Sequence, residues 1–248
     1  MKIFAVYSSK GGVGKTAAAV NLAYSASTSG QRVLLCDLDA QGAASFYFRV
    51  RPGKNFNGKK LLSGNFSKFI RASDYINLDL LPAHFSFRNL DLALAKLERD
   101  TRRQALRKLF TRLEGEYDVL VMDCPPNMTL LSENIILAAD SVITPVIPTT
   151  LSLVSLKQLL KMFKKVGADD NRINGFFSMV EQRKSMHKKV IGKYSKYAIF
   201  RKTQIPYLAE VEKMGLTRQP VGATSSGSVA AQQYSKLWLE LWERSERR

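Results

Sequence analysis

The chain has 248 residues, 45% of them hydrophobic, which is enough for one α/β domain with a sizeable core. Its 38 Lys and Arg residues against 21 Asp and Glu residues give a net charge of +17, and this excess indicates a polyanionic partner, either nucleic acid or anionic lipid. No apolar run of about 18 residues occurs, which argues against a signal peptide and a transmembrane helix and predicts a cytoplasmic protein. No linker or repeat divides the sequence, so we expect a single domain over residues 1–248.

The first stretch of the chain predicts a phosphate-binding loop. An apolar run over residues 3–7 precedes a glycine-rich segment over 9–16, and an Ala-rich segment follows over 17–26, so a strand, a tight loop and a helix start are adjacent. Backbone N–H groups and the positive end of the helix dipole bind phosphate oxygens in such a loop, and the flanking elements argue against the alternative of a glycine-rich turn that binds nothing. Lys15 would reach the β- and γ-phosphates of a nucleotide, and the Thr16 hydroxyl would hold Mg²⁺. The residues predicted to surround the phosphates are Gly11, Gly12, Val13, Gly14, Lys15 and Thr16.

The second predicted strand, over residues 31–37, ends in a pair of acids. Carboxylates at the carboxyl end of a parallel strand lie where open α/β sheets place their ligands. Asp37 and Asp39 are two residues apart, so on an extended strand end they would point the same way. One could reach the water shell of the metal while the other positions the attacking water. For Asp37, a strand-capping role without catalysis is the alternative.

The middle of the chain contains one further candidate metal ligand. Residues 43–73 are expected to be irregular to helical, a third strand is expected over 76–82, and one or two amphipathic helices over 87–113. The clearest buried strand covers residues 117–123 and ends in Asp123. A single acid after an apolar strand is weak evidence of a site. Together with the upstream phosphate-binding loop, Asp123 is a candidate to hold Mg²⁺ through a coordinated water.

The remaining segments complete an alternation of strands and helices. We expect strands over 140–148, 172–180 and 198–205, a helix over 151–166, and a last helix from about 228 to 244. This alternation predicts an α/β fold with a doubly wound, mostly parallel sheet and helices on both faces, of the P-loop NTPase type.

The last helix has two readings. Its Tyr234, Leu237, Trp238, Leu241 and Trp242 recur at helical spacing, so the helix either packs on the sheet or binds a membrane surface. Three glutamates, Glu240, Glu243 and Glu246, interrupt its basic face and favour packing on the sheet.

A basic segment near the carboxyl end predicts a DNA-binding surface. Residues 182–209 contain eight Lys and Arg residues and no acid. Clustered basic side chains neutralise DNA phosphates without reading the base sequence. The predicted DNA-binding residues are Arg183, Lys184, Lys188, Lys189, Lys193, Lys196, Arg201 and Lys202.

The glycine-rich segment resembles the deviant Walker A motif of the ParA/MinD family of ATPases, and the resemblance extends from end to end of the chain. The motif reads Lys10-Gly-Gly-x-Gly-Lys15-Thr16, with Ser9 where the usual P-loop has glycine. The resemblance implies that Lys10 crosses a dimer interface and contacts the phosphates bound by the partner subunit. Ala17 replaces a threonine of many relatives, so only its backbone would contact the nucleotide.

The same resemblance assigns roles to residues outside the loop. It implies that Asp39 orients the attacking water, although Ala40 stands where the family usually has proline. It strengthens the assignment of Asp123 to the metal site. It also implies that Pro206 packs against the adenine ring, although a proline that ends a strand needs no ligand to explain it.

The resemblance predicts a Mg²⁺-dependent ATPase that dimerises with ATP, binds DNA without sequence preference and positions or segregates a plasmid, a chromosome or a large protein assembly. A ParB-like or other small activator protein would stimulate hydrolysis, and the protein would be cytoplasmic and associated with the nucleoid. One alternative is a MinD-like membrane-surface ATPase that regulates division-site placement. Another is an iron–sulfur or flagellar-assembly member of the superfamily, although Cys36 and Cys124 form no Cys-x-x-Cys pair.

Overall fold

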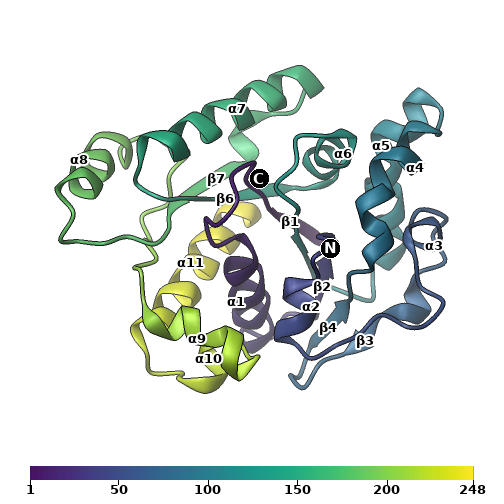
Figure 1. The fold of residues 1–248 in the computed structure, drawn as a ribbon, viewed down its shortest axis with the longest axis horizontal. Coiled ribbons are helices and arrows are strands. Elements are labelled where there is room, and N and C mark those ends of the chain that lie inside the picture. Colours follow the sequence, from purple (N-terminus) through teal and green to yellow (C-terminus); the bar gives the residue numbers. More distant parts are fainter. Residues whose placement is uncertain (248) are drawn as a thin grey trace.

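A seven-stranded sheet forms the centre of residues 1–247, the part of the chain that the computed structural model describes (Figure 1). The strand order is β3-β4-β2-β5-β1-β6-β7, and every neighbouring pair is parallel except β3 with β4. The mostly parallel, doubly wound sheet predicted from the sequence is therefore confirmed. The strands are β1 (Lys2–Val6), β2 (Val33–Asp37), β3 (Arg71–Ala72), β4 (Leu78–Leu81), β5 (Val119–Asp123), β6 (Ser141–Val146) and β7 (Ile173–Phe177).

The strand order places a ligand site beside β1. This strand lies between β5 and β6. The chain leaves β1 toward β2 on one side and later reaches β6 on the other side, so the strand order reverses at β1. Open α/β sheets bind ligands outside the carboxyl ends of the strands at such a reversal. The glycine-rich loop follows β1 directly and therefore begins at this point.

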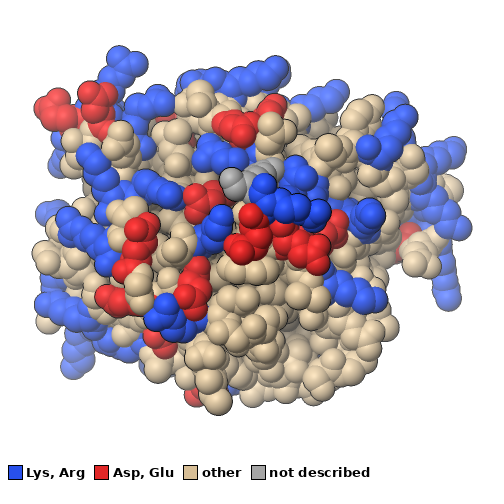
Figure 2. Space-filling view, turned by 180° about the vertical axis from the view of Figure 1, so that it is seen from behind, with Lys and Arg blue, Asp and Glu red and all other residues tan. Residues whose placement is uncertain are grey.

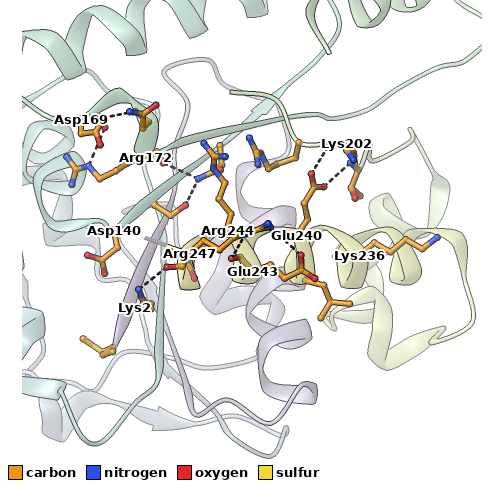
Figure 3. A pocket seen from close by; sticks show the side chains of 18 of the residues that line it. Lys2, Asp140, Asp169, Arg172, Lys202, Lys236, Glu240, Glu243, Arg244 and Arg247 are labelled. Carbon is orange, nitrogen blue, oxygen red and sulfur yellow. Dashed lines mark hydrogen bonds and ion pairs between the residues drawn. The ribbon is translucent and has the colours of Figure 1, made fainter. Parts of the chain in front are cut away.

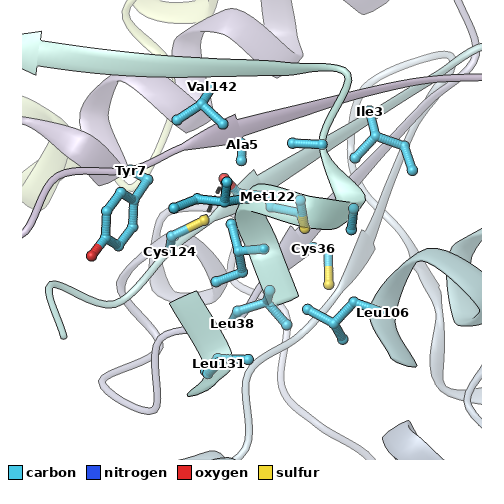
Figure 4. Close-up of a cluster of buried hydrophobic side chains, with 14 of the residues drawn as sticks. Ile3, Ala5, Tyr7, Cys36, Leu38, Leu106, Met122, Cys124, Leu131 and Val142 are labelled. Carbon is cyan, nitrogen blue, oxygen red and sulfur yellow. Dashed lines mark hydrogen bonds between the residues drawn. The ribbon is translucent and has the colours of Figure 1, made fainter. Parts of the chain in front are cut away.

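Each face of the sheet has its own core. Ile3 and Ala5 of β1 pack in the core under α4 to α7, whereas Phe4 and Val6 pack in the core under α1 and α11. Figure 4 shows part of the first core, which also contains the free cysteines Cys36 and Cys124. The α-helices are α1 (Lys15–Thr28), α2 (Ala43–Tyr47), α3 (Gly58–Leu62), α4 (Leu90–Ala95), α5 (Arg99–Phe110), α6 (Leu130–Ala138), α7 (Thr150–Val166), α8 (Ser185–Tyr194), α9 (Ala209–Thr217), α10 (Val221–Thr224) and α11 (Val229–Glu246).

The last helix, α11, packs on the sheet as its sequence favoured. Trp238 is 1% exposed, and its ring meets the ring of Phe4 edge to face at 5.2 Å. Tyr234, Leu237 and Leu241 are also buried, so the aromatic stripe belongs to the core. A search of the helices in residues 1–247 finds none with the length and apolar character that crossing a bilayer requires.

Residues 198–205 do not form the strand that the sequence predicted. Among the described residues, two isolated bridges, one of them at Phe200, join this segment and Pro206 to β7 and the residues after it. Between the bridges, the N–H groups of Lys202 and Thr203 donate to the Glu240 carboxylate of α11 at 2.8 and 3.1 Å. Because Glu240 accepts these two bonds, the backbone cannot continue a regular ladder with β7.

Candidate nucleotide-binding site

The loop between β1 and α1 has a backbone shape suited to phosphate. Gly12 and Gly14 have φ angles of +68° and +90°, in the left-handed region that favours glycine. A Cβ on Gly14 would lie 3.2 Å from Ser178 Oγ, so the position also lacks space for a larger residue. Helix α1 begins at Lys15 without an acidic residue in its first turn, so the positive end of its dipole is available to an anion.

The two lysines of the loop make different contacts. Lys15 is 8% exposed, and its Nζ donates to the carbonyl oxygen of Lys10 at 3.1 Å. Burial lowers the pKa of Lys15, while the negative charge of Asp123 acts in the opposite direction. Lys10 Nζ donates to Ser152 Oγ in α7 at 3.1 Å, and Thr149 Oγ1 donates to the same oxygen at 3.1 Å. The side chain of Lys10 is therefore held by its own chain in this structure.

Two of the predicted metal ligands lie side by side on neighbouring strands. Asp37 ends β2 and Asp123 ends β5, the two residues are in register, and neither is more than 1% exposed. The N–H and hydroxyl of Ser45 donate to Asp37 Oδ2 at 2.8 and 2.7 Å. Burial nevertheless raises the pKa of Asp37 to about 6. Burial, followed by the charge of Asp37, also raises the pKa of Asp123, while the nearby Thr16 hydroxyl acts in the opposite direction.

Asp39 lies beyond the end of β2, in a turn. Its Oδ1 accepts from the Gln41 N–H at 3.0 Å, and its carbonyl accepts from the Gly42 N–H at 2.9 Å. Strand β2 ends at Asp37, as the sequence predicted, and Asp39 follows it at the start of a turn. That the two side chains point the same way stays a prediction. The two carboxylates are still close. Burial is the main cause of the raised pKa of Asp37, and the negative charge of Asp39 raises it further. Asp39 is partly exposed, so solvent water reaches it.

The residues at this edge fit a magnesium ion. Residues 1–247 contain no group of three His, Cys, Asp or Glu side chains that could hold a metal by themselves. Mg²⁺ is commonly held by one or two protein groups together with phosphate oxygens and water. Asp123 fits this role because its carboxylate is buried at the end of β5, and Thr16, the other predicted ligand, lies beside it in the first turn of α1. Asp37 fits less directly because Ser45 already binds one of its oxygens.

Pro206, the predicted adenine contact, pairs with a segment that also approaches the phosphate-binding loop. It forms an isolated bridge with Val180, and Ser178 of the same segment approaches Gly14. Pro206 lines a cavity of about 370 Å³ in which amide side chains offer donors and acceptors to the edges of a base. The other residues that line this cavity are Val180, Gln182, Lys202, Thr203, Gln204 and Gln233.

Most of the predicted DNA-binding residues lie together at α8, but two do not. Arg201 is only 9% exposed and donates to the carbonyl of Ala198, so it is not part of an exposed surface. Lys202 is exposed but lines cavities away from α8. Helix α8 packs against the same core as α7, which exposes further lysines. The exposed basic residues on and around α8 are Arg183, Lys184, Lys188, Lys189, Lys193 and Lys196, and those on α7 are Lys157, Lys161, Lys164 and Lys165.

The sequence analysis missed the hydroxyl groups that support the charged residues. Ser45 follows the carboxyl end of β2 and holds Asp37. Ser152 follows the carboxyl end of β6 and holds Lys10, and Thr149 donates to Ser152. Their position soon after a parallel strand end was the available signal, because these ends meet at one edge of the sheet.

The comparisons with known proteins agree with this geometry. Residues 1–175 match the family model described as an AAA domain. The sporulation initiation inhibitor protein Soj of Bacillus subtilis is 30% identical over 252 residues, covering 97% of this chain and 98% of that protein. A plasmid partition protein of Borrelia burgdorferi bound to AMPPNP has the same fold, with a TM-score of 0.83, 22% identity and 98% of each chain covered. A cobyrinic acid a,c-diamide synthase of Mycobacterium smegmatis with bound ATP analogue and magnesium has a TM-score of 0.79, 25% identity and coverage of 98% of this chain and 96% of that one.

Proposed function

Because the chain belongs to the ParA/MinD family of ATPases, we propose that it dimerises with ATP, binds DNA without sequence preference and uses hydrolysis to position or segregate a cargo. The cargo is a plasmid, a chromosome or a large protein assembly. We place the protein in the cytoplasm on the nucleoid, as one ATPase domain over residues 1–248, with a ParB-like or other small activator protein as its partner.

The phosphate-binding loop beside two buried carboxylates is the observation that carries this proposal. Lys15 would leave the Lys10 carbonyl and bind the β- and γ-phosphates together with the backbone N–H groups of residues 11–17. Thr16 and Asp123, with Asp37 in support, would hold Mg²⁺, which supplies positive charge to the phosphates when bound. Asp39 would orient the attacking water, because it is the acid at this edge that solvent reaches.

Exposed apolar side chains around the loop support a dimer. Leu151 and Val154 at the start of α7 are 70% and 45% exposed, and Met128 after β5 is 46% exposed. These apolar side chains lie around the loop. Lys10 contacts α7, which carries Leu151 and Val154, and Tyr7 Oη donates to the carbonyl of Asn127, the residue before Met128, at 2.9 Å. Large apolar side chains that cluster on a surface commonly mark a protein interface. In the dimer Lys10 would exchange Ser152 for the phosphates of the partner subunit.

The basic surface of α7 and α8 supports DNA binding. Each phosphate that it neutralises would add a slope of about −0.9 to the dependence of log affinity on log salt. A dimer presents the surface twice, so dimerisation alone would strengthen binding. The membrane alternative has less support, since α11 buries Leu237, Trp238 and Leu241 and does not offer them to lipid.

Binding measured with ATP and with ADP tests the proposal. We expect ATP-dependent binding to a random-sequence duplex, a dimer by light scattering, and little binding to anionic vesicles. Changing both Lys188 and Lys189 to Glu should weaken binding to every duplex alike and leave the ATP-dependent dimer intact. The matched control is the change of Lys59 and Lys60 to Glu in α3, outside the basic surface. ATP-dependent binding to vesicles with none to DNA would contradict the proposal and favour a MinD-like function.

A further inference from the structure

A second cavity lies at the opposite edge of the sheet from the phosphate-binding loop. Its volume is about 1450 Å³, and its walls come from the amino ends of β1, β6 and β7, from the segment around Lys202, and from α11. Figure 3 shows Asp140 and Arg172 on one side of it and Lys202 and Lys236 on the other. Ligand sites typically occupy about 300–1,000 Å³, so the cavity has room for a molecule of nucleotide size.

The acids of the cavity are already engaged by the protein. Eight Lys and Arg side chains line it against four Asp and Glu side chains. Asp140 accepts from the Ile3 N–H and from Arg107, both at 2.8 Å, and Glu240 accepts the two backbone bonds of the segment after Phe200. Glu243 pairs with Arg247 at 3.5 Å. These carboxylates therefore serve the fold and leave part of the positive charge of the wall uncompensated.

Several cations of the wall have no acidic partner. Within residues 1–247, no carboxylate lies within 4.0 Å of the charged groups of Lys2, Arg172, Lys202, Lys236 or Arg244, the criterion that identifies the other ion pairs. Arg172 donates to the carbonyl of Ala139 at 2.8 Å, and burial lowers its pKa. Asp169 and Asp140 lie near enough to act on Arg172 by their charge, but they form no ion pair with it. Partly buried cations without a direct ion pair attract an anion from solution.

Two buried polar atoms in the wall also lack partners. Asn174 is 2% exposed, and its Nδ2 donates to Ser141 Oγ at 2.7 Å, whereas its Oδ1 has no hydrogen-bonding partner among the described residues. The Nε of Arg244 is likewise buried without an acceptor. A buried polar atom without a partner is costly unless a ligand or water satisfies it. The wall thus offers donors for an anion and an acceptor for a hydroxyl or amino group.

We propose that this cavity binds a small molecule that carries at least two phosphate groups and a hydrogen-bond donor, such as a nucleotide phosphorylated on both sides of its ribose. Arg172 and Arg244 present planar guanidinium groups, which match phosphate oxygens in pairs. Lys236 and Lys202 supply further charge from the opposite wall, and Asn174 Oδ1 accepts from the hydroxyl or amino group. Figure 2 shows the face behind that of Figure 1, where acidic side chains near the middle lie among a larger number of basic ones.

Titration calorimetry with two probes tests the site. Adenosine 3′,5′-bisphosphate and inorganic tripolyphosphate are titrated at low salt into the full chain carrying Lys15→Ala, so that the phosphate-binding loop does not contribute. We expect both probes to bind with one site per chain. Adding Lys236→Glu and Arg244→Glu should lower both affinities on the order of 100-fold, because each lost contact between unlike charges weakens binding about tenfold. The matched control is Lys213→Glu, an exposed lysine on α9 outside the cavity, which should change neither affinity.

A milder variant and a third probe complete the test. Asn174→Ala should weaken the bisphosphate about fivefold and leave tripolyphosphate unchanged, because only the nucleoside carries a donor for Oδ1. ATP hydrolysis is measured on the cavity variants with Lys15 restored, and unchanged turnover shows that the fold and the proposed ATPase function are intact. No binding of either probe up to about 1 mM, or an equal loss in the Lys213→Glu control, would overturn the proposal. Binding of a short DNA duplex alone, lost in the double variant, would also overturn it and make the cavity part of the DNA surface.

Discussion

The two edges of the sheet handle charge in different ways. At the carboxyl edge the positive charge of Lys15 lies near the carboxylates of Asp37, Asp39 and Asp123. Asp37 and Asp123 are buried, and burial raises the pKa of both. At the amino edge basic side chains outnumber acids, and the acids are bound to backbone N–H groups or to arginines. The carboxyl edge therefore has the chemistry to bind a metal, whereas the amino edge has the chemistry to bind an anion.

One mostly parallel sheet can therefore present opposite chemistries at its two edges. Strand ends that share a direction gather the residues of the loops that follow them, and strand starts gather the residues of the loops before them. If this separation is real, changes at the carboxyl edge should alter nucleotide binding and hydrolysis and leave anion binding at the amino edge unchanged.

Asp39→Ala should slow ATP hydrolysis by about 10²- to 10⁴-fold, because an acid that orients water contributes to the rate and not to affinity. The variant should bind ATP, dimerise and remain in that state. Phosphate release at saturating ATP and the lifetime of the dimer measure the effect. Tripolyphosphate binding at the amino edge, measured with Lys15→Ala added so that the loop does not contribute, is the control. Normal turnover would assign the role to another residue.

Lys15→Ala and Lys10→Ala should fail at different steps, although both remove a positive charge from one loop. Loss of Lys15 removes the contact within the chain and should lower nucleotide affinity on the order of 100-fold. Loss of Lys10 should leave nucleotide affinity unchanged and prevent the ATP-dependent dimer. Fluorescent nucleotide binding and light scattering separate the two outcomes. A Lys10→Ala protein that dimerises with ATP would refute the role of Lys10 across the interface.

Asp37→Asn should stabilise the protein at pH 7 in the absence of nucleotide and Mg²⁺. The pKa of Asp37 in the folded chain is about 6, above the ordinary value of about 3.9, so the folded state takes up a proton that the unfolded chain does not. Stability therefore falls as the pH rises from about 4 to 6, by about 2–3 kcal/mol for this group. Urea unfolding at several pH values should show a smaller decline in the variant. An equal decline in both proteins would contradict this reading of Asp37.

Ser152→Ala should favour the dimer, because it removes the acceptor that holds Lys10 against α7. A net hydrogen bond contributes about 1 kcal/mol, so the ATP concentration for half-maximal dimer should fall about fivefold. Ser155→Ala, one turn later in α7, is the matched control and should have no effect. An unchanged midpoint for Ser152→Ala would show that this contact does not restrain Lys10.

The sequence indicated the residues at the carboxyl edge because each of them belongs to a recognisable local pattern. The phosphate loop is one contiguous motif, and Asp37 and Asp123 each end an apolar run that identifies a buried strand. The predicted end of the second strand at residue 37 agrees with the structure, but the pattern did not show that Asp39 begins a turn. The family resemblance supplied the role of Lys10, but no local pattern indicates its bond to Ser152, 142 residues away.

The amino edge was missed because no continuous segment encodes it. Lys2, Asn174 and Arg244 lie far apart in the sequence, and each reads by itself as a surface charge or as part of a strand. The strand predicted over 198–205 failed for a related reason, since Glu240 on α11 accepts two of its N–H groups. Helix α8 escaped prediction because His187 is its one fully buried residue, which gives the segment little apolar periodicity.

The two backbone N–H groups that donate to Glu240 also affect how the protein behaves at high local concentration. An exposed strand at the end of a sheet offers a row of donors and acceptors that a second copy can extend into an aggregate. Here the segment beside β7 is irregular, and a carboxylate occupies two of its donors. At the other end of the sheet, β3 spans only Arg71–Ala72 and carries a charge. If the protein binds DNA as proposed, many copies could gather on one DNA molecule without joining edge to edge. Glu240→Ala should make the protein aggregate at lower concentration.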